Sequence, residues 1–130
     1  MLSSLRTMVY NRLVAQLTAA GMSAVKVWQI ERPQETGQSY VVFDVNLRLQ
    51  GTGTAPTYDT AVEATCAAPS SAVCAQIAQV TQAALDDYCA ANSNVRLLGL
   101  TVVSSEDGRA PDAEPALWLN TLRWQGLTIG

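Results

Sequence analysis

The most constraining feature of this sequence is one amphipathic stretch, residues 68–92, with strand-like sequence on both sides. Pro69 followed by Ser70 and Ser71 is typical of a helix start, because serine hydroxyls can cap the free amide groups of a first turn. Apolar residues then recur at steps of four, three, four and four, at Val73, Ile77, Val80, Ala84 and Tyr88. That spacing is one face of a helix, and the Asn-Ser-Asn sequence at 92–94 is a stop signal. A single helix between strands is expected to lie across one face of their sheet.

Alternating sequence on both sides of this helix predicts a sheet with one apolar face. The clearest strand is residues 39–50. Val41, Phe43, Val45, Leu47 and Leu49 take one side of it, and Asp44, Asn46, Arg48 and Gln50 take the other. Further strands are predicted at residues 24–31, 57–67, 95–105 and 116–125. In the strand 95–105, Leu98, Leu100 and Val102 are expected to share a face, and Gly99 marks a bulge.

The chain begins with a second amphipathic segment. Its apolar stripe, which predicts a helix ended by Gly21, is Leu2, Leu5, Val9, Leu13 and Leu17. The element order is therefore α-β-β-β-α-β-β in a single domain, residues 1–130. The predicted fold class is α+β, with an antiparallel or mixed sheet of about five strands and the helices packed on one face. Residues 105–115 are expected to be a projecting loop, mobile until a partner binds, since Gly108, Pro111 and Pro115 disfavour regular structure.

The net charge of −3 is concentrated in this predicted loop. Four of the eleven acids, Glu106, Asp107, Asp112 and Glu114, lie there with one of the eight bases, Arg109, which leaves seven of each elsewhere. The rest of the chain is therefore neutral, and the balance gives no sign of a nucleic-acid footprint.

Nothing in the sequence predicts catalysis, a cofactor or a metal site. The chain has no histidine, and Cys66, Cys74 and Cys89 lack zinc-site spacing, which predicts buried free thiols in a reducing compartment. Asp86 and Asp87 have no third ligand nearby and are interpreted as solvated side chains on the outer side of the helix. No secretory signal and no apolar run of ~20 residues is present, so a cytosolic protein without membrane contact is expected.

Arginine and tryptophan are the residues that favour an interaction role. Seven of the eight bases are arginine, although a GC-rich coding sequence would give the same bias. Tryptophans 28, 118 and 124 are either packed in the sheet or anchors in a subunit contact. The candidate interface with another subunit or partner comprises Arg48, Glu106, Asp107, Arg109, Asp112, Glu114, Trp118 and Arg123.

Several local patterns together resemble a known family. They are LRTMVYNRL in the first helix, YVVFDVNLRL, YDTAVEATCAA, SSAVCAQIAQVTQAALDDY, SEDGRAPDAEP and LNTLRWQG. In this order they resemble the tail terminator (tail completion) proteins of long-tailed bacteriophages, of the minor tail protein U type.

The resemblance implies a non-enzymatic assembly protein that forms a hexameric ring, caps the tail tube, stops its polymerisation and provides the head–tail joining surface. It implies three partners: the tail tube protein, head–tail connector proteins, and genomic DNA that passes through the lumen without specific binding. It implies assembly in the host cytoplasm and a final place in the tail or neck of the virion. Two alternatives stay open: another neck component, such as a head-completion or connector protein, and a small ligand-binding α+β module.

Overall fold

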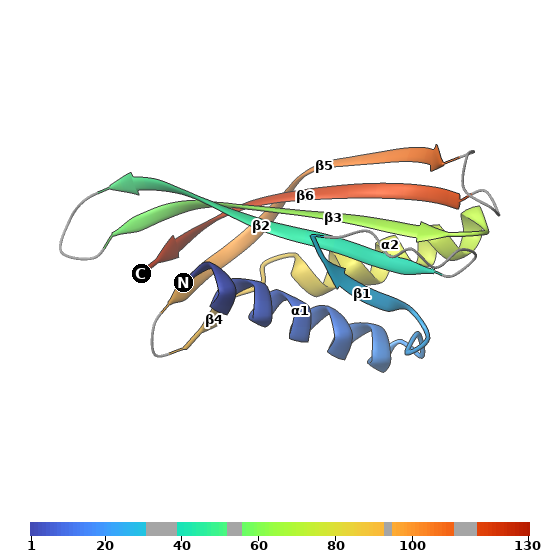
Figure 1. Ribbon diagram of the computed structural model, residues 1–130, viewed down its shortest axis with the longest axis horizontal. Coiled ribbons are helices and arrows are strands. Elements are labelled where there is room, and N and C mark those ends of the chain that lie inside the picture. The colour runs from blue at the N-terminus through green and yellow to red at the C-terminus, as the bar shows by residue number, and fades with distance from the viewer. Residues whose placement is uncertain (31–38, 52–55, 93–94, 111–116) are drawn as a thin grey trace.

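The computed structural model describes residues 1–30, 39–51, 56–92, 95–110 and 117–130. In chain order the elements are α1 (Leu2–Ala19), β1 (Lys26–Gln29), β2 (Tyr40–Gly51), β3 (Thr57–Ala68), α2 (Ser71–Leu85), β4 (Ala90–Ala91), β5 (Arg96–Ala110) and β6 (Leu117–Ile129). The strands form one sheet in the order β1-β2-β3-β6-β5-β4, in which β1 pairs with β2 in parallel and the other pairs are antiparallel. Both helices lie on the same side of it (Figure 1). This confirms the predicted α+β class, with six described strands instead of about five because of the two-residue β4.

The core fills the space between the two helices and the sheet. The predicted stripe of α1 is buried at Leu5, Val9, Leu13 and Leu17, and Gly21 follows the helix with a φ of +77°. The apolar side of the sheet that packs against the two helices includes Val41, Phe43, Val45, Val62, Ala64, Leu122 and Trp124. Helix and strand periods thus match across one apolar layer, as the sequence predicted.

The amphipathic stretch starts where predicted but ends earlier. Ser70 Oγ accepts a hydrogen bond from the Val73 amide at 3.3 Å, and the helix ends at Leu85 rather than near residue 92. Its buried side is Cys74, Ile77, Ala78, Thr81, Ala84 and Leu85. Val73, which was predicted to be on that side, is 39% exposed. The small side chains Cys74 and Ala78 face the sheet instead.

Asp86 and Asp87 tie the end of α2 to the sheet. Asp86 Oδ1 accepts a hydrogen bond of 3.0 Å from Nε1 of Trp124, an indole that is 1% exposed. Asp87 adopts a left-handed conformation (φ 57°), and its amide donates to the Leu100 carbonyl at 2.9 Å. The interpretation as a solvated aspartate on the outer side of the helix is therefore wrong for Asp86; the Asp87 side chain is exposed as expected, but it follows the helix instead of lying on it. Asp86 supplies the acceptor that a buried indole N–H requires.

The strand β2 is buried over only part of its length. Val41, Phe43 and Val45 are buried, Leu47 is partly buried, and Leu49 is 53% exposed. In Figure 1 the β2–β3 hairpin extends past both helices, so no helix covers its far end. The predicted core position of Leu49 is wrong for that reason.

The greatest difference from the sequence prediction lies in β5. This strand continues to Ala110, and its residues from Ser105 onward pair with residues 117–122 of β6. Glu106, Asp107 and Arg109 are therefore strand residues, and the prediction of a loop from residue 105 is wrong for residues 105–110. The remainder of that predicted loop, including Asp112 and Glu114, lies outside the described residues.

The predicted bulge at Gly99 is confirmed. Gly99 has a φ of +124°, and the β5–β6 register shifts between Leu97 and Leu100. The additional residue changes the phase of the strand, so that Leu97 and Leu100 are both buried while Leu98 is 40% exposed. The expectation that Leu98 shares the face of Leu100 is therefore wrong.

Candidate interaction surfaces

The structure divides the predicted interface residues between two sides of the sheet. Asp107, Arg109 and Trp118 belong to the helix-bearing side, at the free end of the β5–β6 hairpin. Glu106 and Arg123 belong to the opposite side, here called the helix-free face. Successive residues of a strand point to opposite faces, which separates Glu106 from Asp107.

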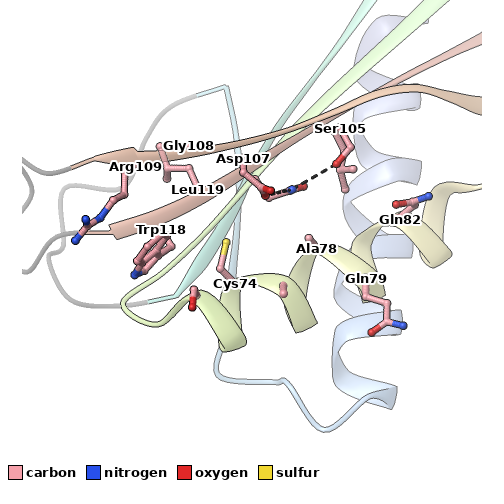
Figure 2. A pocket seen from close by; sticks show the side chains of 14 residues that line it. Cys74, Ala78, Gln79, Gln82, Ser105, Asp107, Gly108, Arg109, Trp118 and Leu119 are labelled. Atoms are coloured by element: carbon pink, nitrogen blue, oxygen red, sulfur yellow. Dashed lines mark hydrogen bonds between the residues drawn. The ribbon is translucent and has the colours of Figure 1, made fainter.

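Between α2 and the hairpin end lies an open cavity of ≈ 650 Å³, here called the hairpin groove. Helix α2 supplies Cys74, Ala78 and Gln79 to it, and the hairpin supplies Asp107, Arg109 and Trp118, among other residues (Figure 2).

The polar side chains of the hairpin groove are held in fixed positions. The Arg109 guanidinium lies 4.5 Å from the centre of the Trp118 ring, a cation–π contact. Asn120 Nδ2 donates to Asp107 Oδ1 at 2.8 Å and to Ser105 Oγ at 3.4 Å. Trp118 remains 37% exposed. A half-exposed tryptophan beside an arginine is the residue combination enriched in protein–protein contacts.

Two of the three cysteines, Cys66 and Cys74, are buried and unsuited to nucleophilic chemistry. Burial raises the pKa of the Cys66 thiol to about 12. Burial also raises the pKa of the Cys74 thiol, and the nearby Asp107 carboxylate raises it further. Both thiols are therefore protonated at neutral pH. Cys89 is also a free thiol but is exposed, so the prediction of buried thiols is wrong for this residue.

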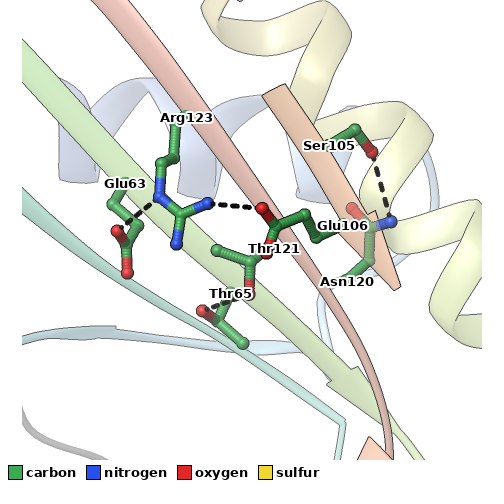
Figure 3. A network of polar contacts seen from close by, with 7 residues as sticks. All are labelled: Glu63, Thr65, Ser105, Glu106, Asn120, Thr121 and Arg123. Atoms are coloured by element: carbon green, nitrogen blue, oxygen red, sulfur yellow. Dashed lines mark hydrogen bonds and ion pairs between the residues drawn. The ribbon is translucent and has the colours of Figure 1, made fainter. Parts of the chain in front are cut away.

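On the helix-free face, three side chains from three strands form a charge ladder (Figure 3). Arg123 Nε donates to Glu63 Oε2 at 2.9 Å, and Arg123 Nη1 lies 3.4 Å from Glu106 Oε1. The hydrogen bond that Arg123 donates to Glu63, together with the negative charge of Glu63, raises the pKa of Arg123. All three side chains are at least 41% exposed, so the ladder contributes little to stability.

Sequence reasoning missed Glu63. Its place on the polar side of the strand 57–67 was readable from the alternation, but its pairing with Arg123 depends on the β3–β6 register. Arg48 lies away from both groups, on β2, opposite Asp59 of β3. There it borders a second cavity of ≈ 430 Å³.

The described residues contain neither a candidate metal cluster nor a membrane-spanning helix. No three histidine, cysteine or acidic side chains in this part of the chain are grouped so that they could hold a metal ion. No helix in the same residues is long and apolar enough to cross a membrane.

Comparison with known proteins gave a likeness of fold. No protein-family model matches this chain. No curated protein sequence matches it either. Among solved structures, a chain in the virion of a native gene transfer agent (GTA) particle matches with a TM-score of 0.63 and 21% sequence identity. The match covers 94% of this chain and 92% of that chain. The two chains therefore share a fold over nearly their whole lengths.

Proposed function

We propose that this chain is a non-enzymatic virion protein that forms a ring and closes the end of a phage-type tail tube. The observation that carries the proposal is the shared fold with a chain of a gene transfer agent virion, over 94% of this chain. The resemblance of its local patterns to tail terminators supports the narrower role. In that role the ring, of six subunits, stops tube growth and joins tail to head.

The helix-free face suits the lumen of such a ring. A phosphate backbone is held by bases that are free to contact it. Arg123 is paired with Glu63 and Glu106, and Arg48 lies opposite Asp59 in the β2–β3 register. DNA could pass such a surface without being held on it. The helices would then lie on the outside of the ring.

The hairpin groove suits the contact with the tube protein. It combines apolar lining, a half-exposed Trp118 and the fixed charges of Arg109 and Asp107. An aromatic side chain in a partly enclosed cavity is the kind of anchor that dominates protein–protein affinity. We assign the tube contact to this groove.

The test is assembly with tail tubes. We expect the purified protein, alone or mixed with tubes, to give six-fold rings in electron micrographs and a six-subunit mass by native mass spectrometry. Because cyclic closure limits a head-to-tail contact, no larger polymer is expected. A protein that stays monomeric at high concentration and also in the presence of tubes would contradict the ring.

Trp118→Ala is expected to weaken binding to tubes by at least tenfold, because it removes the aromatic anchor of the hairpin groove. Trp28→Ala is the matched control: Trp28 lies on β1 and is 38% exposed, against 37% for Trp118. Co-sedimentation of each variant with tubes measures the effect, and unfolding curves check that both are folded. If the two variants bind tubes equally well, the hairpin groove is not part of the tube interface.

A second candidate function has one observation in its favour. The hairpin groove has the volume of a small-molecule site, which is typically ~300–1,000 Å³. A ligand-binding module would remain a monomer or dimer with tubes present, and a different neck component would bind heads rather than tubes. Parallel sedimentation with tubes and with filled heads therefore separates all three functions.

A further inference from the structure

Both long edges of the sheet are open over much of their length. On one side, β1 pairs with β2 only at residues 40–43. On the other, β4 pairs with β5 only at residues 96–97. No strand in the described part of the chain pairs with the outer edge of residues 44–49 or of residues 104–110. Such edges carry free backbone donors and acceptors and are templates for pairing with another chain. On the β2 edge, the Val45 amide already donates to Asp44 Oδ1 at 2.8 Å, and the other outward backbone amides belong to Leu47 and Leu49.

The two open segments are regular and similar in length. Residues 44–49 of β2 pair with β3 without a break in register. Residues 104–110 of β5 pair with β6 in the same way, because both register shifts of β5 occur before residue 104. Bulges are one of the devices by which proteins prevent edge pairing, and neither open segment contains one.

The direction of the two edges suits a ring. Three antiparallel pairings separate β2 from β5, so the two strands run in opposite directions within one subunit. Rotation about a ring axis preserves the direction of a strand along that axis. When β5 of one copy is placed beside β2 of the next, the pair is therefore antiparallel. Because the two edges differ, the contact is head-to-tail, which is the kind of contact that builds a ring when the rotation between copies closes.

The side chains at the two edges are complementary. Arg48 on β2 and Glu106 on β5 both belong to the helix-free face and carry opposite charges. The Glu106 side chain is 68% exposed. The β2 edge also exposes the apolar side chain of Leu49, at 53%, whereas the equally exposed Val103 of β5 lies at the register shift just outside the open segment. Opposite charges across a strand pair stabilise it.

From these observations we infer that residues 44–49 of one copy pair with residues 104–110 of a second copy of this chain. The sheets of neighbouring subunits would then form one continuous wall, with the helix-free face on one side of it. This inference rests on the proposed function, because it states how the subunits of the ring are joined.

Chemical cross-linking tests the pairing. In a Cys89→Ser background, which removes the exposed thiol, Arg48→Cys is combined with Glu106→Cys and treated with a short bismaleimide in the presence of tubes. The two positions lie at opposite edges of one subunit, so a link between them joins two copies. We expect a ladder of covalent oligomers that ends at the ring size. The matched control keeps Arg48→Cys and moves the second cysteine to Gln76, exposed on α2, and should give no ladder.

The other outcomes separate this inference from the proposed function. Rings that appear in micrographs while the double variant stays unlinked would overturn the edge pairing and leave the tail function standing. Covalent dimers from either single variant, Arg48→Cys or Glu106→Cys, would show pairing of like edges and would also overturn it. Absence of any assembly with tubes would overturn both.

Discussion

Val45→Asp is expected to abolish soluble folding, whereas Leu49→Asp on the same side of the same strand is expected to leave the protein folded. Val45 is 0% exposed and belongs to the core between helices and sheet. Leu49 is 53% exposed because the helices do not reach its end of β2. A buried unpaired carboxylate costs several kcal/mol, and a whole domain is stable by only about 5–15 kcal/mol.

Soluble yield and the cooperativity of urea unfolding measure this pair of variants. Ile77→Asp, at a second position that is 0% exposed, should behave like Val45→Asp. If Val45→Asp unfolds cooperatively with a midpoint near that of the parent protein, the assigned core is wrong. If Leu49→Asp fails to fold, the far end of β2 is covered by something that the described residues do not include.

Gly126→Ala is expected to destabilise the protein by roughly 3 kcal/mol, the upper end for an overpacked site. A Cβ at residue 126 of β6 would overlap the carbonyl oxygen of Gly99 and lie 3.0 Å from Leu100 Cδ2. The overlapping atom is backbone, so the bulge of β5 would have to move. That bulge places Leu97 and Leu100 in the core, and its movement would disturb both.

Gly108→Ala is the control for this effect. Gly108 lies on the facing strand β5, where an added Cβ would meet Leu119 Cβ at 3.9 Å, an ordinary contact. Replacing such a glycine reduces the entropy of the unfolded chain and should stabilise by about 0.4–1 kcal/mol. The urea midpoints of the two variants should therefore shift in opposite directions. A shift of Gly126→Ala no larger than that of Gly108→Ala would contradict the close approach of the two strands.

Where local periodicity was strong, the sequence was sufficient to predict the structure. Periodicity predicts the buried stripe of α1 and the burial of Val41, Phe43 and Val45. The capping serine predicts the helix start at Ser70. Gly99 predicted the bulge in β5, because few other residues adopt the positive φ that it has there. These features depend on neighbours in the chain, and the chain alone specifies them.

The candidate interface could be predicted only in part. The sequence grouped Glu106, Asp107 and Arg109 as one acidic loop, because a polar, glycine-containing segment has no strand signal of its own. Pairing with β6 makes that segment a strand, so that Glu106 lies on the helix-free face and Asp107 on the helix-bearing side. Glu63, which completes the charge ladder, comes from a strand far away in the sequence.

The sequence by itself determined the element order and which sides of most elements are apolar, since these depend on spacings of two and of three to four residues. Only the tertiary structure decided how far each apolar side is covered, where α2 ends and which charges meet. Helix coverage leaves Leu49 exposed, and the indole of Trp124 gives Asp86 its partner. Each of these outcomes depends on contacts between segments far apart in the chain, and no local spacing encodes a contact of that kind.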